Sequence, residues 1–202
     1  RSIDPCRKVN SERLPVSEGK KLILSSLSEE SEESIKKRKK EWDVLYVEPR
    51  EILTMIKPGE HIYFDDGKFE AKVLSVEENK VVVKVVRIST KKPYLKPGKG
   101  INLPDSELNI PPLTEEDKAN IPFICQYADM VGYSFVSKPE DVNALRTEIT
   151  KFSNHHRPAI VLKIERLSAL QNLPALLMNG MQDEALGVMI ARGDLAVEIG
   201  FE

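Results

Sequence analysis

Three charged side chains in the C-terminal part of the sequence have the types and spacing that phosphoryl or enolate chemistry needs. Lys163 and Glu165 are two residues apart in the segment AIVLKIE, so on a strand they point to the same face. Asp194 follows the next apolar segment, LGVMIAR. Two carboxylates with water can hold Mg²⁺, and a lysine beside the metal would stabilise a transferring phosphoryl group or a developing enolate. The backbone amides around Arg192-Gly193-Asp194 would bind an anion, especially if a helix begins there.

A structural interpretation of these residues stays open. An unpaired charge on a buried strand is costly, so Lys163 and Glu165 are also compatible with an ion pair that only stabilises the fold. The tripeptide Arg-Gly-Asp is also compatible with an ordinary surface turn. Adjacent His155 and His156 point apart on a loop, which favours a solvated loop over a metal-binding pair.

The segments that would position these side chains alternate between apolar strands and helices. We expect strands over residues 129–136, 159–165 and 186–192, and helices over residues 115–128, 139–152 and 167–179, the last interrupted by Pro174. Near-continuous apolar strands that alternate with helices predict a buried parallel sheet. This half of the sequence is therefore predicted to be α/β.

The preceding part of the sequence is rich in β-branched and aromatic residues. We expect strands over residues 20–24, 44–47, 61–64, 69–76 and 80–88, with turns at KPGE, DDGK and EENK. Short strands at this spacing predict a small antiparallel barrel or sandwich. The proline- and glycine-containing segment 91–113 predicts the boundary with the α/β half, and residues 1–14 show no periodicity and predict an irregular lead-in.

Composition and charge limit the classes of function. The 202 residues carry a net charge of −2, with 41% hydrophobic and 31% charged residues, which is typical of a soluble globular protein and speaks against general nucleic-acid binding. The charged run 25–43 predicts a solvated helix, because acidic residues flank its basic segment 36–40. No apolar run reaches about 18 residues, so no membrane span is expected. Cys6 and Cys125 are predicted to be reduced thiols, and we expect a cytoplasmic location; an organellar one stays open because the first residue is Arg1.

The order of these pieces resembles pyruvate kinase. A strand ending in Lys-Ile-Glu, a helix, and a strand ending in Ala-Arg-Gly-Asp match the centre of that family's catalytic barrel. The segments YFDDGKFEAKVLSV and GKGINLPDSELNIPPLTEEDKANI resemble its small β-domain and the return into the barrel, and VGYSFVSKPEDVNALR is similar to the strand and helix that follow. The resemblance covers residues 42–202. It implies an α/β fold: a partial (β/α)₈ TIM barrel with an inserted all-β small barrel domain that closes over the active site as a lid.

Three regions follow from this resemblance. Residues 1–14 are expected to be the lead-in, or a remnant of the catalytic barrel. Residues 15–111 are expected to form the β-barrel lid domain, and residues 112–202 part of the catalytic barrel. A complete (β/α)₈ barrel takes about 250 residues. We therefore expect the chain to be a piece of a longer protein and to be inactive alone.

The resemblance also implies an activity: Mg²⁺-dependent phosphoryl transfer from phosphoenolpyruvate to ADP, giving pyruvate and ATP in glycolysis. Lys163 matches the lysine that neutralises charge on the transferring phosphoryl group, and Glu165 and Asp194 match the Mg²⁺ ligands. The backbone amides of Gly193 and Asp194 match those that hold the carboxylate of phosphoenolpyruvate. Lys99 matches a nucleotide-contacting lysine of the lid, with a solvated loop lysine as the alternative. K⁺, whose ligands would lie outside this chain, and a homotetramer are family expectations.

Some positions depart from the family pattern. Two of them, Ala196 and Gly200, stand where the family usually has Gly and Pro; the others are Arg166, Ala169 and Ser137. These changes leave the metal ligands intact and affect expectations for substrate affinity and allosteric contacts. Two other functions stay open. One is a Mg²⁺-dependent aldolase-type enzyme acting on phosphoenolpyruvate or pyruvate, against which the Lys99 segment speaks; the other is a non-catalytic interaction module derived from pyruvate kinase.

Overall fold

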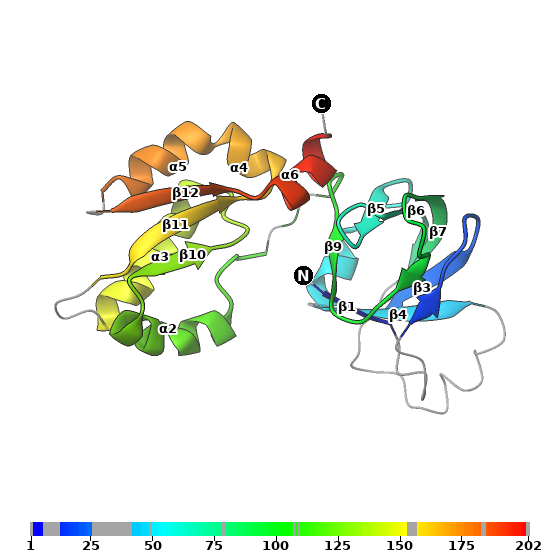
Figure 1. Ribbon diagram of the computed structural model, residues 1–202, viewed down its shortest axis with the longest axis horizontal. Helices are drawn as coiled ribbons and strands as arrows, with labels where there is room; N and C mark the ends of the chain where they lie inside the picture. Colours follow the sequence, from blue (N-terminus) through cyan, green and yellow to red (C-terminus); the bar gives the residue numbers. More distant parts are fainter. Residues whose placement is uncertain are drawn as a thin grey trace. The chain divides into compact units, whose positions relative to one another are not determined.

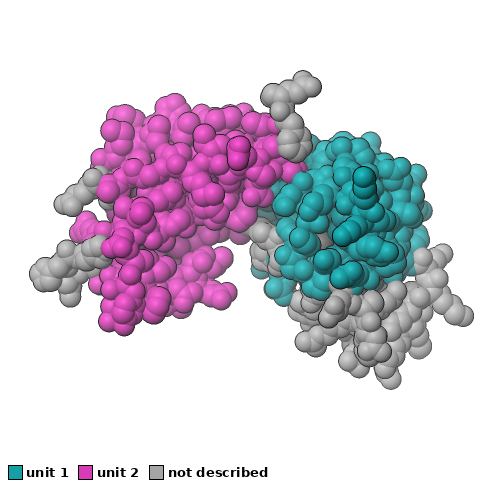
Figure 2. Space-filling view, viewed as in Figure 1, with its two compact units in different colours: residues 1–108 teal, residues 109–202 magenta. Residues whose placement is uncertain are grey.

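The computed structural model describes residues 2–5, 13–25, 42–48, 50–77, 80–106, 108, 110–152, 157–182 and 185–200. The chain divides into two compact units, Arg1–Leu108 and Asn109–Glu202, coloured teal and magenta in Figure 2. Cys6, the basic segment 36–40 and His155-His156 lie outside the described residues, so the predictions for them stay predictions. In the described parts of the chain, no helix has both the length and the apolar character needed to cross a membrane.

Unit 1 contains a closed barrel with the strand order β1-β4-β3-β7-β6-β5-β9, in which β1 also pairs with β9. Its strands are β1 (Ser2–Pro5), β3 (Lys21–Ser25), β4 (Asp43–Glu48), β5 (His61–Phe64), β6 (Phe69–Glu77), β7 (Lys80–Ile88) and β9 (Lys99–Asn102). The short strands β2 (Leu14–Pro15) and β8 (Tyr94–Leu95) pair with each other, and a 3₁₀ helix, η1 (Arg50–Met55), follows β4.

Alternation of buried and more exposed side chains explains these strands. In β5, Ile62 and Phe64 are fully buried while His61 and Tyr63 are partly exposed, as the period of two requires. The strands expected from β-branched and aromatic residues are all present, so those predictions are confirmed. Two other predictions are wrong. Strands β3 and β4 run parallel, so the barrel is not wholly antiparallel, and Ser2–Pro5 is a strand because its backbone pairs with β4 and β9.

Unit 2 is a three-stranded parallel sheet, in the order β10-β11-β12, with helices between the strands. Its elements are α2 (Glu115–Tyr127), β10 (Met130–Tyr133), α3 (Pro139–Phe152), β11 (Ala159–Ile164), α4 (Leu167–Gln171), α5 (Leu173–Gly180), β12 (Leu186–Ile190) and α6 (Arg192–Ile199). In Figure 1, α2 and α3 flank the β10 side of the sheet, and α4 and α5 flank the β12 side. The chain therefore has a mixed α/β fold, and the predicted parallel sheet is confirmed.

Local sequence signals account for the helix boundaries of unit 2. Thr114 caps α2: its hydroxyl accepts from the Asp117 N–H and the Asp117 carboxylate accepts from the Thr114 N–H, which is a capping box. Pro139 is the first residue of α3. Pro174 ends one helix and starts another, because it sits in the first turn of α5 directly after α4. These predicted helices are confirmed.

The two faces of the β10-β11-β12 sheet differ in what covers them. Ile160, Leu162 and Ile164 of β11 point into the core shared with the helices. The opposite face carries Lys163, and Met130 and Met189, which share that face, are exposed. The continuous apolar strands predict a sheet that is buried on both faces. Within the described residues of unit 2, only one face is buried, so this prediction is wrong there.

Candidate active site

Lys163 and Glu165 contact each other directly at the carboxyl end of β11. The Lys163 Nζ lies 2.6 Å from the Glu165 Oε1, and the Glu165 side chain is only 2% exposed against 27% for Lys163. The ammonium group also donates to the Ser134 Oγ at 2.7 Å. The second carboxylate oxygen, Oε2, accepts from the backbone N–H of Phe135 at 2.7 Å. Four residues from two neighbouring strand ends thus form one hydrogen-bonded group.

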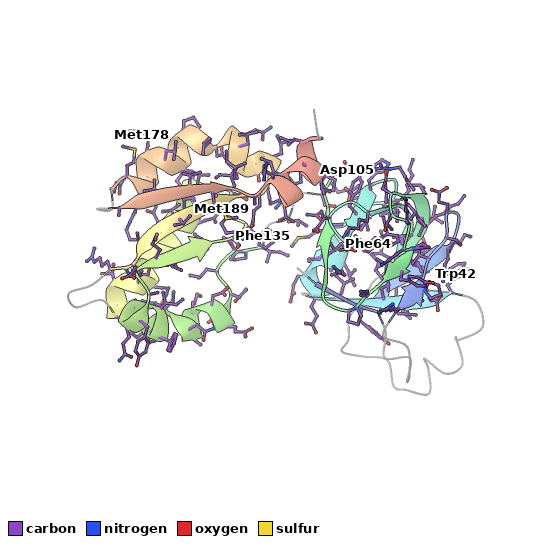
Figure 3. The ribbon with its side chains drawn as sticks, viewed as in Figure 1. Trp42, Phe64, Asp105, Phe135, Met178 and Met189 are labelled. Atoms are coloured by element: carbon purple, nitrogen blue, oxygen red, sulfur yellow. The ribbon has the colours of Figure 1, made fainter. Side chains whose placement is uncertain are left out.

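Sequence reasoning missed Ser134 and Phe135, because it assigned them to a strand over residues 129–136. Strand β10 ends at Tyr133, and the next two residues turn away from it. Phe135 has a φ of +58°, a left-handed conformation that non-glycine residues seldom adopt. Figure 3 labels Phe135 at the end of the sheet where β10 stops. Its sequence gives no signal for this turn, since it is glycine or asparagine that usually marks such a position.

Helix α6 begins at the same edge of the sheet. Ile164 pairs with Ile190 in register, and the Ala191 N–H donates to the Ile164 carbonyl at 3.0 Å, so β11 and β12 end together. Asp194 lies in the first turn of α6 and Gly193 precedes it. No side chain caps the helix at Ala191. The N–H groups of such a first turn carry partial positive charge and are suited to an anion.

Gly193 leaves space beside that first turn. A Cβ atom built at Gly193 would meet no atom within 4 Å among the described residues. Gly132, on β10, would present its own Cβ 3.7 Å from the Lys163 side chain. The backbone at Gly193 therefore faces open space, into which a ligand group could approach without a steric barrier.

An ion pair fastens α6 to the end of β11. The Arg166 Nε lies 3.1 Å from the Glu198 Oε1, and the Leu167 N–H donates to the Glu198 Oε2 at 2.9 Å. Both charged side chains are well shielded, with 16% and 8% of their surface exposed. Arg166 is one of the positions that departs from the family pattern, and here its charge has a partner on the helix that carries Gly193 and Asp194.

The carboxylates fit a magnesium ion better than a metal that needs many protein ligands. Among the described residues, no group of three or more His, Cys, Asp or Glu side chains is arranged to hold a metal. Mg²⁺ needs only one or two carboxylates, because water and substrate oxygens complete its shell. Glu165 and Asp194 follow the carboxyl ends of adjacent parallel strands, β11 and β12. They supply the hard oxygen donors that this ion prefers.

Lys99 belongs to unit 1, at the start of β9, and it too forms an ion pair. Its Nζ lies 2.9 Å from the Asp65 Oδ1, while Lys68 lies 3.2 Å from the other oxygen, Oδ2. The hydrogen bond that Lys99 donates to the Asp65 carboxylate, together with the negative charge of that carboxylate, raises the pKa of Lys99. Burial raises the pKa of Asp65, but the hydrogen bonds and charges of Lys99 and Lys68 outweigh it and hold that pKa below 3.8. Asp65 itself has a φ of +53°, in the turn between β5 and β6.

Comparison with known proteins gives the same family over most of the chain. Residues 6–202 match the family model described as pyruvate kinase, barrel domain. Pyruvate kinase from Hypocrea jecorina is 34% identical over 77% of this chain and 27% of its own length. The relative from Clostridium perfringens is 36% identical over 76% of this chain and 30% of its own length. The relative from Schizosaccharomyces pombe is 32% identical over 92% of this chain and 33% of its own length. The chain therefore spans a third or less of these curated relatives.

Proposed function

Because the chain belongs to the pyruvate kinase family, we propose that its site takes part in phosphoryl transfer from phosphoenolpyruvate to ADP. The observation that carries the proposal is the Lys163–Glu165 pair at the carboxyl end of β11, beside the start of α6. The carboxyl ends of parallel strands are where barrel enzymes of this architecture place their catalytic groups. A purely structural ion pair would need no open helix N-terminus beside it.

Lys163 acts as an electrostatic catalyst in this proposal. Its ammonium group neutralises negative charge that spreads over the phosphoryl oxygens as the bond to the enolate oxygen breaks. The group is held by two acceptors, Ser134 and Glu165, and 27% of the side chain is exposed, so it is both fixed and accessible. Fixed positioning matters because a preorganised charge does not have to reorient during the reaction.

Glu165 and Asp194 would hold Mg²⁺, which supplies further neutralisation of phosphate and enolate charge when it is bound. The Phe135 N–H already keeps the Glu165 carboxylate in one orientation. The first-turn N–H groups of Gly193 and Asp194 bind the carboxylate of phosphoenolpyruvate. The open space at Gly193 and the absence of a side-chain cap at Ala191 support that role.

The proposal gives unit 1 the role of a lid. We place it as an all-β domain inserted into a (β/α)₈ barrel, of which unit 2 supplies three strands. Lys99 contacts the phosphates of the nucleotide, and to do so it exchanges the Asp65 carboxylate for a phosphate oxygen. K⁺ dependence and a homotetramer are further parts of the proposal; both rest on family membership alone.

A coupled pyruvate assay tests this function. The complete protein that the gene encodes (the gene-encoded protein) and the 202-residue chain are each supplied with phosphoenolpyruvate, ADP and Mg²⁺. We expect the gene-encoded protein to form pyruvate and ATP in equal amounts, and the chain alone to be inactive. Pyruvate that forms without ADP, or consumption of phosphoenolpyruvate or pyruvate only with an aldehyde, would favour an aldolase-type enzyme. No turnover under any of these conditions would favour a non-catalytic module and contradict the proposal.

A further inference from the structure

The turn that follows β10 contacts both members of the Lys163–Glu165 pair, and the sequence pattern does not indicate these contacts. We propose that Ser134 and the backbone N–H of Phe135 are positioning groups. They hold the Lys163 ammonium group and the Glu165 carboxylate in fixed orientations. The catalytic consequence rests on the proposed function, while the positioning itself does not. The two groups contact the pair separately: the Ser134 hydroxyl accepts from Lys163, and the Phe135 N–H donates to Glu165, each at 2.7 Å.

The backbone conformation of Phe135 supports this role. A φ of +58° is unfavourable for a residue with a large side chain, and such strain persists only where the surroundings enforce it. Here the strained residue is the one whose N–H reaches a carboxylate that is almost completely buried. A buried carboxylate needs such a donor, because an unpaired charge away from water is costly. The strain and the hydrogen bond therefore belong to one arrangement.

The turn is held at its start by β10, whose last residue Tyr133 pairs with Leu162 of β11, and at its end by hydrogen bonds. The Ser137 and Lys138 N–H groups donate to the Asp141 Oδ2 at 2.8 and 3.0 Å, at the start of α3. The Asn172 side-chain amide donates to the Ser137 carbonyl at 2.9 Å, so the same residue is held by a second element. A short turn held by strand pairing at one end and by side-chain hydrogen bonds at the other can fix the groups between them. Asn172 sits between α4 and α5, so two helix boundaries of unit 2 hold the turn in place.

Ser134 gives the Lys163 ammonium group a second, neutral acceptor. In this structure the ammonium group divides its hydrogen bonds between the Ser134 hydroxyl and the Glu165 carboxylate. Any cation that binds Glu165 competes with Lys163 for that carboxylate. The hydroxyl carries no charge, so it attracts a cation less and remains bound to the lysine. Without Ser134, the lysine would either hold on to Glu165 or swing into solvent.

The positioning is tested first without catalysis. In the 202-residue chain with ¹⁵N-labelled lysine, the Lys163 ammonium signal is assigned by its loss in Lys163→Met. We expect protection from hydrogen exchange in the parent chain and in Ser134→Thr, which keeps a hydroxyl. We expect exchange about tenfold faster in Ser134→Ala, since a hydrogen bond to a charged group is lost. The matched control is Ser168→Ala, which removes a hydroxyl that bonds to Ser137 and not to Lys163. An unprotected signal in the parent, or equal protection in Ser134→Ala, would overturn the inference.

Kinetics of the gene-encoded protein then separate this inference from the proposed function. We expect Ser134→Ala to lower kcat about tenfold with KM for phosphoenolpyruvate nearly unchanged, and Ser134→Thr to restore most of the loss. An equal loss in Ser134→Thr, or a change confined to KM, would count against positioning. If the parent protein has no activity but the ammonium signal responds as expected, the proposed function fails and the positioning stands.

Discussion

The Arg166–Glu198 ion pair offers a quantitative test of how the site is held together. Glu198 accepts from both the Arg166 side chain and the Leu167 N–H, and only 8% of its side chain is exposed. Removing one partner of a shielded ion pair leaves the other charge unpaired, which typically costs about 3 kcal/mol. We therefore expect Glu198→Ala to lower the free energy of unfolding of unit 2 by about 3 kcal/mol. For a unit of this size, that corresponds to a melting temperature about 15 °C lower.

Two spectroscopic signals allow the units to be followed separately. Trp42 is the only tryptophan of the sequence and lies in unit 1, so its fluorescence reports on that unit. In the part of the chain that the structure describes, every α-helix lies in unit 2, so unfolding of unit 2 removes their far-ultraviolet circular dichroism. In urea, Glu198→Ala is expected to shift the circular dichroism transition to lower denaturant and to leave the fluorescence transition in place.

A double-mutant cycle isolates the contribution of the pair. Arg166→Met and Glu198→Ala are expected to be less destabilising together than the sum of the single changes by about 2 kcal/mol, because each single change leaves an unpaired charge. The control is Lys151→Met, which breaks the more exposed Lys151–Glu148 pair on α3 and is expected to cost no more than about 0.5 kcal/mol. If Glu198→Ala costs no more than this control, the ion pair does not fasten α6, and the reasoning is wrong.

Three further predictions follow from other contacts. The Tyr133 hydroxyl is buried without a hydrogen-bond partner among the described residues, and burial raises its pKa; Tyr133→Phe should therefore stabilise unit 2 by about 1 kcal/mol in urea unfolding, and a loss of stability would reveal an unseen partner. Lys99 and Lys68 hold the pKa of Asp65 below 3.8, so this carboxylate stabilises unit 1 above that pH and ceases to do so as the pH falls through the lowered pKa. Asp65→Asn should accordingly make unit 1 less stable near neutral pH and less sensitive to acid below about pH 4, whereas an unchanged acid transition of Trp42 fluorescence would contradict the pairing. Gly193→Ala should leave the melting temperature unchanged, because a Cβ meets open space there, but should raise KM for phosphoenolpyruvate several-fold; an unaltered KM would remove the first turn of α6 from the substrate site.

Much of unit 2 could be predicted because its sequence signals are local. The near-continuous apolar run predicts β11, Pro174 predicts the break between α4 and α5, and Thr114 with the acidic residues after it predicts the start of α2. The placement of Lys163 and Glu165 on one face follows from their spacing alone. Their ion pair was one of two alternatives that the sequence left open, and its 2.6 Å contact is compatible with either a structural or a catalytic role.

The parts that could not be predicted depend on contacts between segments distant in sequence. Ser2–Pro5 has no periodic pattern, and it becomes a strand only because β4 and β9 supply hydrogen-bond partners on both sides. The left-handed turn at Phe135 is stabilised by Glu165, thirty residues later, and no residue near Phe135 indicates it. Arg166 departs from the family pattern, but its partner Glu198 follows only from the packing of α6 against the end of β11.

Lys163→Met in the complete protein that the gene encodes tests most directly whether Lys163 is the electrostatic catalyst of phosphoryl transfer. We expect kcat to fall about 100-fold or more while KM for phosphoenolpyruvate changes little, because the ammonium group acts mainly on charge that develops in the transition state. Lys163→Arg serves as the companion variant, since it keeps the charge and changes the geometry. A Lys163→Met protein with the kcat of the parent, or with a change in KM alone, would contradict the claim that Lys163 is the electrostatic catalyst.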